Sequence, residues 1–272
     1  MELPRAENSA ARLRYVAEAV STNDSLAALA ADPDEPTLSV FLTLSQTAGR
    51  GRLGRSWIAP PGKTLAVSVL IRPLLPSGEP VGIENLGWLP LLAGTAMTRA
   101  IDALVGHART TLKWPNDVLI DGRKVCGILA ELLPSGNGVI IGAGVNLTLG
   151  EDDLPVPTAT SLALAGVAGA GTGAAGAELV DAVLGGYLEF LAELLGRFLA
   201  GGADARGSGI LSEVARVCST LGQDVRVELP GGTTLTGVAK ALDASGRLEV
   251  LSGANGEIQA VAAGDVTHLR YE

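Results

Sequence analysis

The sequence predicts an α+β fold in which helices flank a mixed β-sheet and a small β-domain follows. Two observations support this prediction. The β-rich stretches follow one another through hairpin signals with helical stretches inserted between them, instead of alternating strictly with helices. After Gly222 the pattern changes to short strands separated by glycine turns, which is typical of a small β-barrel. We therefore expect a first domain over residues 1–221 and a C-terminal domain over residues 222–272.

The amino-terminal segment combines a tail with a capped helix. Residues up to Asn8 are expected to be disordered, and residues 13–20 are compatible with either a short helix or a strand. Residues 21–24, Ser-Thr-Asn-Asp, offer N-cap side chains to a helix that ends near Ala31.

Hydrophobic periodicity and turn signals assign the remaining elements. Strands are expected over residues 37–44, 63–72, 118–120, 124–133 and 139–149. Helices are expected over residues 83–105, 178–199 and 211–221. Residues 110–114 should be extended, because the residue before Pro115 disfavours helix. Residues 163–177 are nearly all Ala and Gly and are expected to form a mobile connector.

The composition excludes several classes of protein. A net charge of -9 argues against wide nucleic-acid contact, which normally needs a broad basic face. No signal peptide is visible, and the longest uncharged stretch, residues 154–177, is broken by proline and glycine and would be a poor membrane span. Two distant cysteines and two histidines indicate neither a disulfide framework nor a structural zinc cluster. We expect a soluble, reduced, cytoplasmic protein.

Residues 46–57, QTAGRGRLGRSW, interleave three glycines with three arginines. From residue 36 to residue 78 there is no Asp or Glu, and five Lys and Arg residues give this window a charge of +5. Such a loop can wrap a phosphate, because glycine permits close approach and arginine donates bidentately. The Walker A pattern GxxxxGK[ST] is absent. The segment favours a local anion site, and the alternative is a solvated basic loop or an RNA-type Arg/Gly segment.

Lys113 ends a predicted strand between two apolar residues, within KWPND at residues 113–117. A partly enclosed ammonium facing an anion fits this setting, although a lone lysine on a strand is more often a solvated edge residue. Asn116 and Asp117 are ordinary turn residues, and the sharper interpretation of Asp117 is a magnesium-binding carboxylate.

Ser21, Thr22 and Asn23 are by default a helix N-cap. As a site, they would place hydroxyl and amide groups at the positive end of a helix dipole, which suits a polar neutral ligand head. Trp57 closes the Gly/Arg segment, directly after its last arginine and Ser56, but a tryptophan is more often a core residue than a ligand platform.

Taken in order, these motifs resemble those of the biotin protein ligase family. Three further segments match, namely residues 124–131 (KVCGILAE), 141–146 (IGAGVN) and 159–162 (ATSL). The resemblance covers roughly residues 13 to 270, and the QTAGRGRxGRxW and KWPND motifs are highly specific together. It implies a class II synthetase-like catalytic domain with a C-terminal SH3-like β-barrel. The chain resembles the monofunctional class, since the residues before the Ser-Thr-Asn motif are too few for an N-terminal helix-turn-helix.

The resemblance implies an ATP-dependent ligase with biotin and ATP as substrates and Mg²⁺ as the metal. A biotin carboxylate would attack the α-phosphate of ATP to give biotinyl-5'-AMP. A lysine of the biotin carboxyl carrier domain of acetyl-CoA carboxylase, or of a related carboxylase, would then attack this mixed anhydride and release AMP. The first step brings like charges together, so cations must neutralise them. No DNA or membrane partner is expected, and the oligomeric state stays open between a monomer and a homodimer.

The resemblance also assigns roles to residues. Lys113 would bridge the biotin carboxylate and the α-phosphate and, with Arg52, is the expected catalytic residue. The expected biotin-binding residues are Ser21, Thr22, Asn23, Gln46, Gly49, Arg50, Gly51, Arg52, Lys113, Gly127 and Gly142. The expected ATP and adenylate contacts are Arg50, Arg52, Arg55, Trp57, Lys113, Lys124 and Asn146. Asp117 is the expected metal ligand.

Two alternatives stay open. A lipoate-type protein ligase shares the fold and a motif lysine but lacks the Gly/Arg segment. A nucleic-acid-binding module would use the Gly/Arg segment together with the β-barrel, but this region has no aromatic stripe on which bases could stack.

Overall fold

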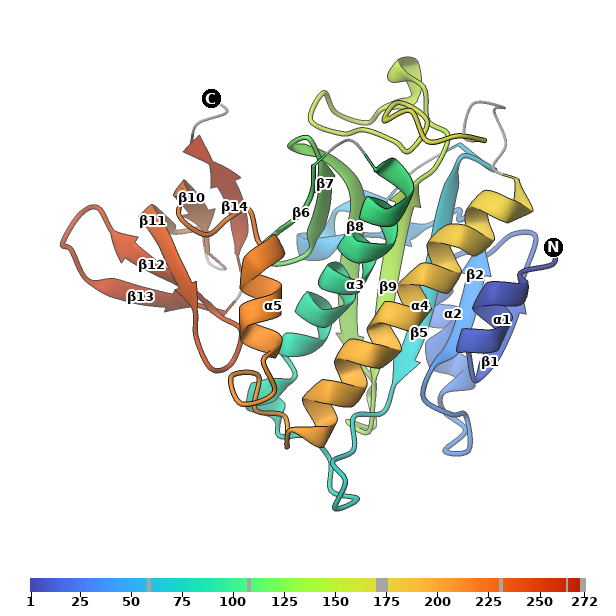
Figure 1. The fold of residues 1–272 in the computed structure, drawn as a ribbon, viewed down its shortest axis with the longest axis horizontal. Helices are drawn as coiled ribbons and strands as arrows, with labels where there is room; N and C mark the ends of the chain where they lie inside the picture. Colours follow the sequence, from blue (N-terminus) through green and yellow to red (C-terminus); the bar gives the residue numbers. More distant parts are fainter. Residues whose placement is uncertain (58–59, 107–108, 170–175, 230–231, 263, 270–272) are drawn as a thin grey trace.

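A seven-stranded sheet forms the centre of the fold, in the strand order β1-β2-β5-β9-β8-β7-β6 (Figure 1). The computed structural model describes residues 1–57, 60–106, 109–169, 176–229, 232–262 and 264–269. The strands of this sheet are β1 (Arg12–Tyr15), β2 (Ser39–Thr43), β5 (Thr64–Ile71), β6 (Thr110–Lys113), β7 (Asp117–Ile120), β8 (Arg123–Leu132) and β9 (Val139–Asn146). β1 pairs parallel with β2, and the other neighbours in this sheet pair antiparallel. The predicted mixed sheet is therefore confirmed.

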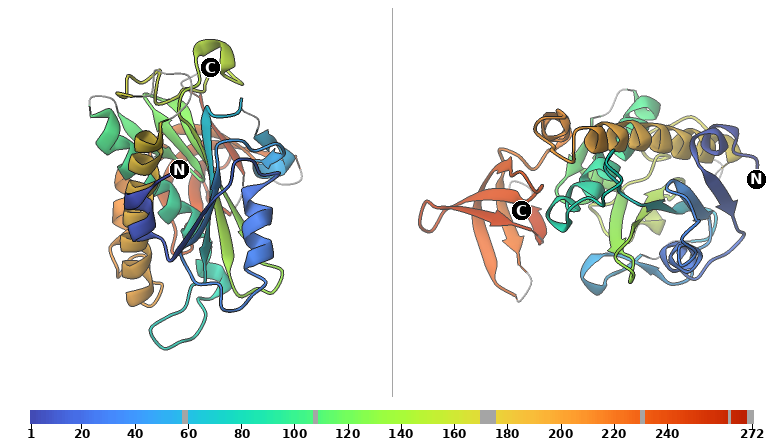
Figure 2. Two further views of the ribbon diagram at one scale, coloured as in Figure 1. Left: turned by 90° about the vertical axis from the view of Figure 1, so that its right-hand side faces the viewer. Right: turned by 90° about the horizontal axis from the view of Figure 1, so that it is seen from below.

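Helices cover both faces of the sheet (Figure 2). α3 (Trp88–Val105) and α4 (Ala177–Ala200) pack against each other on one face, and α1 (Pro4–Ser9) packs beside α4. α2 (Thr22–Leu29) lies on the opposite face. Successive side chains of a strand point to opposite faces of the sheet, and helices cover both faces. The interior strand β5 is therefore buried at every residue.

The first residues form a helix, which corrects the prediction of a disordered tail. α1 begins at Pro4, whose missing N–H is not needed at a helix start. Arg5 forms an ion pair with Glu189 of α4 at 2.6 Å. Asp181 of α4 accepts hydrogen bonds from the backbone N–H groups of Arg5 and Ala6, at 3.1 and 2.9 Å. The undecided stretch after α1 contains strand β1.

The helix expected over residues 83–105 is divided. A 3₁₀ turn, Ile83–Asn85, precedes α3, and Gly87 lies between them as the helix N-cap. Pro90 occupies the first turn of α3, where the backbone N–H of a helix has no partner within the helix. Of the Ala/Gly connector expected over residues 163–177, residues 170–175 lie outside the described part of the chain.

A buried carboxylate anchors strand β1. Glu35 is 3% exposed and accepts hydrogen bonds from Arg12 at 2.9 Å and from Arg14 at 2.7 and 3.1 Å. The hydrogen bond from Arg14 is the largest cause that lowers the pKa of Glu35 to about 2, and burial of the carboxylate opposes it.

Replacing Glu35 with glutamine is expected to lower the free energy of unfolding at pH 7 by about 2 kcal/mol. The pKa of Glu35 is lower in the folded state than its ordinary value of 4.5, so ionised Glu35 stabilises the fold above pH 4.5 and this contribution falls as the pH drops toward 2. Urea unfolding of both proteins at pH 7 and pH 3 measures the effect. The gap in stability should narrow at pH 3, and an equal gap at both pH values would contradict this role.

The Gly/Arg segment folds as a β-hairpin. Its strands β3 (Gly49–Arg50) and β4 (Ser56–Trp57) pair antiparallel. A 3₁₀ turn, Arg52–Gly54, joins them, and Gly54 has a φ of 74°, in the left-handed region that favours glycine. We call residues 49–57 the Gly/Arg hairpin.

A five-stranded antiparallel sheet follows helix α5 (Ile210–Val217), which confirms the small β-domain. Its strands are β10 (Asp224–Glu228), β11 (Thr234–Leu242), β12 (Leu248–Ser252), β13 (Ile258–Val261) and β14 (Asp265–His268), in the order β13-β12-β11-β10-β14. The Nε1 atoms of Trp88 and Trp114 donate to the carbonyls of Ala244 and Gly246, at 2.7 and 3.1 Å. Two tryptophans thus tie this sheet to the first part of the chain. Within the described residues, no helix is both long and apolar enough to cross a bilayer.

Candidate active site

A cavity lies where the start of α2, the Gly/Arg hairpin, strands β8 and β9, and the start of β14 meet. Most of the residues predicted from the sequence line it, namely Ser21, Thr22, Asn23, Gln46, Arg50, Gly51, Arg52, Arg55, Trp57, Asp117, Lys124, Gly127 and Gly142. Gly49, Lys113 and Asn146 do not line it.

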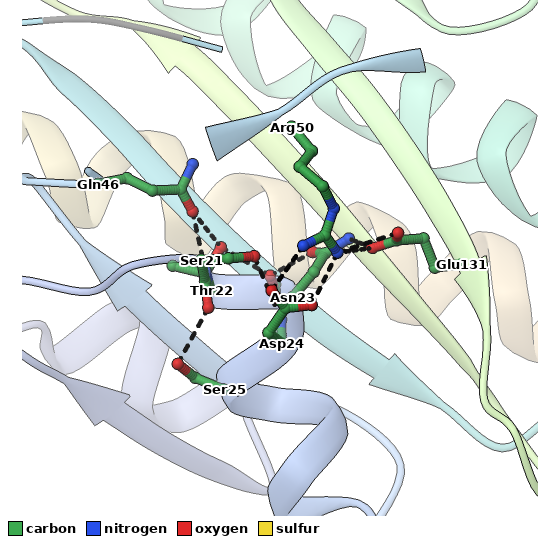
Figure 3. Close-up of polar contacts among 9 residues, drawn as sticks. Ser21, Thr22, Asn23, Asp24, Ser25, Gln46, Arg50 and Glu131 are labelled. Carbon is green, nitrogen blue, oxygen red and sulfur yellow. Dashed lines mark hydrogen bonds and ion pairs between the residues drawn. The ribbon is translucent and has the colours of Figure 1, made fainter. Parts of the chain in front are cut away.

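The start of α2 presents ordered polar groups to the cavity (Figure 3). The Ser21 hydroxyl caps the helix by accepting from the backbone N–H of Asp24 at 3.3 Å. Gln46 Oε1 accepts from the backbone N–H of Thr22 at 2.8 Å. The chain next to Gln46 is held in place by the hydrogen bond from the Thr47 N–H to the Ala19 carbonyl, at 3.0 Å.

Ser68 of β5 and Glu131 of β8 fix the orientation of the Asn23 amide. The Ser68 hydroxyl donates to Asn23 Oδ1 at 2.6 Å, and Asn23 Nδ2 donates to Glu131 Oε2 at 2.5 Å. Ser68 Oγ also lies 2.8 Å from Thr22 Oγ1, and the Thr22 hydroxyl donates to Gln46 Oε1 at 3.1 Å. The buried polar end of the cavity therefore has a defined set of donors and acceptors.

The floor of the cavity has no side chains at three positions, because glycines occupy them on β8 and β9. Gly127 of β8 pairs with Gly144 of β9. A Cβ atom at Gly144 would lie 2.4 Å from Cε2 of Trp57, and one at Gly142 would lie 2.4 Å from Oδ1 of Asn23. Only glycine at these positions lets Trp57 and Asn23 lie directly on the sheet. The indole N–H of Trp57 is buried and has no hydrogen-bond partner within the described residues.

The three arginines of the hairpin have different partners. Arg50 contacts two carboxylates, Asp24 at 2.5 Å and Glu131 at 2.9 Å. Arg55 pairs with Asp265 of β14.

Arg52 is half-buried and donates to Oδ1 of Asn116, an uncharged group, at 3.0 Å. Burial lowers its pKa, and the nearby Asp117 and Asp265 oppose this, but an arginine stays protonated in proteins. Within the described hairpin, Arg52 is thus the arginine whose charge is not paired with a carboxylate at contact distance.

Lys124 of β8 is held at the cavity from both sides of its backbone. Its N–H donates to the Thr158 carbonyl at 2.7 Å, and its carbonyl accepts from the Thr160 N–H at 2.8 Å. Its Nζ lies 2.6 Å from Oδ1 of Asp117 and 5.8 Å from the centroid of the Trp57 ring. The segment with the ATSL motif therefore positions the cavity lysine.

Lys113 lies away from the cavity floor. It ends β6, the edge strand of the sheet, and β7 separates β6 from β8 and β9. The pKa of His268 in β14 is lowered to about 4, mainly by burial and secondarily by the charge of Lys113. The lysine that lines the cavity is Lys124, whereas Lys113, for which a bridging role is expected from the sequence, does not line it.

Asn146 and Gly49 support the cavity from outside. Asn146 is buried and its Nδ2 donates to the Thr160 carbonyl at 2.8 Å, which does not support the expected adenine contact. A Cβ atom at Gly49 would lie 2.4 Å from Nε2 of Gln46 and 2.5 Å from the Trp57 carbonyl oxygen.

Asp117 does not have the setting of a magnesium ligand. Its carboxylate is paired with Lys124, and the described residues contain no group of three or more His, Cys, Asp and Glu that could hold a metal. Since Mg²⁺ prefers an octahedron of oxygens, the residues present do not fit a magnesium site built by the protein.

Comparisons with known proteins match this architecture. The profile of the Biotin/lipoate A/B protein ligase family matches residues 19–146, and that of the Biotin protein ligase C terminal domain matches residues 220–269. The biotin–[acetyl-CoA-carboxylase] ligase of Mycobacterium tuberculosis is 37% identical over 268 residues, which cover 95% of this chain and 90% of the relative. The chain belongs to the biotin protein ligase family.

Two further relatives of the ligase match it over different fractions of their length. A bifunctional ligase/repressor from Bacillus spizizenii is 35% identical over 51% of this chain and 41% of its own length. The structure of biotin protein ligase from Aquifex aeolicus in complex with biotin and ATP has a TM-score of 0.70 and 25% identity, and the match covers 94% of this chain and 98% of that one.

Two contributors to the ligase site, Ser68 and Glu131, were not predicted as site residues. Each is a polar residue inside a largely apolar strand, over residues 64–71 and 123–132. An isolated polar residue in such a run is a signal, because a buried polar group needs a hydrogen-bond partner.

Proposed function

We propose that this ligase forms biotinyl-5'-AMP in the cavity and transfers biotin to a lysine of a carrier domain. It acts as a biotin–[acetyl-CoA-carboxylase] ligase, as family membership and the 37% identity to the Mycobacterium tuberculosis enzyme support. One observation carries the proposal for the site. The cavity has neutral hydrogen-bonding groups at the start of α2 and cationic groups, Arg52 and Lys124, along its wall.

The neutral end suits the ureido ring of biotin. This ring has two N–H donors and one carbonyl acceptor and no charge, so it needs paired neutral groups instead of an ion. Ser21, Thr22, Asn23 and Gln46 supply hydroxyls and amides there. The N–H of Trp57, which has no hydrogen-bond partner among the residues that the structure describes, supports a ligand contact as well, because a buried unpaired donor costs about 1–3 kcal/mol.

The cationic wall suits the reacting carboxylate and phosphate. In the first step, a carboxylate oxygen of biotin bonds to the α-phosphorus of ATP and pyrophosphate leaves. Lys124 takes the place next to the reacting phosphate, where its ammonium offsets the negative charge that develops. Arg52 donates to the phosphate of the intermediate and, with the hairpin, keeps water from the mixed anhydride.

In the second step, the amine of the acceptor lysine attacks the acyl carbon. An amide bond forms, the bond from the acyl carbon to the phosphate oxygen breaks, and AMP leaves with the electron pair. A wider groove beside the cavity supports access for a carrier domain, because it shares the hairpin residues Arg50, Arg52 and Arg55 and extends to Ser245 and Arg247 in the turn between β11 and β12.

Magnesium enters this proposal only as the ion that ATP carries. The enzyme is inferred to work in the cytoplasm, where its two cysteines, which are buried and not in a disulfide, stay reduced.

Biotin-dependent exchange of labelled pyrophosphate into ATP tests the proposal, with lipoate assayed in parallel. Exchange with biotin alone is expected, followed by a single biotin on a carrier domain in mass spectrometry. Exchange with lipoate alone would favour the lipoate-type alternative, and exchange with neither would overturn the proposal in favour of a binding module.

Replacing Gly142 with alanine is expected to weaken biotin binding about tenfold, because the new Cβ displaces Asn23 from its position on the sheet. Calorimetric titration with biotin measures the change. Gly196→Ala is the matched control, since this helical glycine has open space around its Cβ position and should bind biotin normally. Normal affinity in Gly142→Ala would contradict the contact between Asn23 and the ligand.

A further inference from the structure

Glu131 joins two segments of the site. It projects from β8, and its Oε2 accepts from Nδ2 of Asn23 at 2.5 Å and from Nη2 of Arg50 at 2.9 Å (Figure 3). Asn23 belongs to the start of α2, and Arg50 belongs to the Gly/Arg hairpin. One carboxylate oxygen therefore contacts both the neutral end of the cavity and the hairpin over it.

On the α2 side, Glu131 determines which way the Asn23 amide faces. Ser68 donates to Oδ1 and Glu131 accepts from Nδ2, so the oxygen and the nitrogen of the amide have fixed places. Without the carboxylate, the Ser68 hydroxyl alone would hold the amide, and the amide could rotate about its terminal torsion. The ligand would then meet a less ordered Asn23.

On the hairpin side, Glu131 and Asp24 together hold Arg50. The Nη1 atom of Arg50 donates to Asp24 at 2.5 Å, and Nη2 donates to Asp24 at 2.8 Å and to both oxygens of Glu131 at 3.0 and 2.9 Å. The hydrogen bond to Asp24 is the largest cause that raises the pKa of Arg50. Two carboxylates already surround this guanidinium, so it is poorly placed to bind a phosphate as well.

We propose that Glu131 is a positioning residue that couples the Asn23 amide to the Gly/Arg hairpin, with Arg50 as the tether. This inference rests on the proposed function. The tether holds the first strand of the hairpin against α2 and β8, while Arg52 remains for the phosphate. Asp24 contacts Arg50 and Ser21 but not Asn23, so it belongs to the tether and not to the link with Asn23.

Three variants separate the two links of Glu131, namely its hydrogen bond with Asn23 and its tether to Arg50. Glu131→Thr keeps a residue that favours strands but is too short to reach either partner, so it removes both links. Glu131→Gln keeps an oxygen for Asn23 but turns an amide donor toward the Arg50 guanidinium, so it weakens the tether. Asp24→Asn weakens the tether from the other side and leaves Asn23 untouched.

Two measurements test the hydrogen bond with Asn23 and the tether to Arg50 separately. Calorimetric titration of biotin without nucleotide reports on Asn23. The dissociation rate of labelled biotinyl-5'-AMP from a preformed complex reports on the tether. We expect Glu131→Thr to weaken biotin binding about tenfold and to speed release of the intermediate about tenfold. Glu131→Gln and Asp24→Asn should bind biotin within about twofold of wild type and release the intermediate several times faster.

Other patterns would overturn the inference. Unchanged biotin affinity in Glu131→Thr would remove the link to Asn23, and unchanged release in all three variants would remove the tether. Equal loss of biotin affinity in Asp24→Asn would mean a general disturbance of the cavity. Should Glu131→Thr not fold, Glu131→Ala repeats the truncation with the same expected results. Biotin-dependent pyrophosphate exchange by the wild-type protein distinguishes failure of the proposed function from failure of the coupling by Glu131. If the wild type shows no exchange, the proposed function is wrong. If it does, the variants test the coupling alone.

Discussion

Replacement of Lys124 with alanine is expected to slow biotin-dependent pyrophosphate exchange by about a thousandfold. The reason is electrostatic, because the ammonium that offsets charge at the reacting phosphate is lost. Biotin should still bind within about threefold of wild type, since the neutral end of the cavity is unchanged. Exchange kinetics and calorimetric titration with biotin together measure this separation.

Lys113→Ala is the matched control, because it removes an ammonium of the same kind from β6, which β7 separates from the β8 strand of Lys124. Its exchange rate should stay within about tenfold of wild type, since Lys113 does not line the cavity. The Lys124 variant also leaves Asp117 without its ion pair, so thermal unfolding of both variants must show intact folds. A collapse of exchange in Lys113→Ala with near-normal exchange in Lys124→Ala would reverse the assignment.

Replacement of Arg52 with glutamine is expected to shorten the retention of biotinyl-5'-AMP by about a hundredfold. Arg52 is the hairpin arginine whose charge is not paired with a carboxylate at contact distance in the described structure, and its neutral replacement keeps a donor for Asn116 but no charge for the phosphate. The released mixed anhydride reacts with amines in solution. Mass spectrometry should therefore find biotin on unrelated lysines of a bystander protein.

Arg55→Gln serves as the comparison for Arg52. It lies in the same hairpin but pairs with Asp265 at an exposed position, and exposed ion pairs contribute little. Bystander labelling should remain near the wild-type level in this variant. If Arg52→Gln modified only the carrier domain, Arg52 would have no part in retaining the intermediate.

The layout of the site could be predicted from the sequence where local signals were sufficient. The N-cap pattern at Ser21 placed the start of α2, and the family resemblance singled out Gly127 and Gly142, both of which line the cavity. The mixed sheet followed from hairpin signals such as Asp121-Gly122, where both residues have a positive φ.

Other features depend on contacts between distant parts of the chain. α1 looked like a tail because its partners on α4 lie 175 to 184 residues away. Lys113 and Lys124 lie eleven residues apart in one motif-rich region, and only the folded sheet, with β7 between their strands, shows that Lys124 lines the cavity.

The same limit applies to the three arginines of the hairpin, which look alike in sequence. Arg50 is distinguished by Asp24 and Glu131, and Arg55 by Asp265, which is 210 residues away.

A crystal structure with a non-hydrolysable analogue of biotinyl-5'-AMP tests the assignment of the site most directly. We expect the ureido ring to lie between Asn23 and Gln46. Nζ of Lys124 and the guanidinium of Arg52 should lie within about 3 Å of the phosphate mimic or the linking acyl oxygen. Arg50 should remain on Asp24 and Glu131. An analogue whose phosphate mimic contacts Lys113 and leaves Lys124 paired only with Asp117 would contradict it.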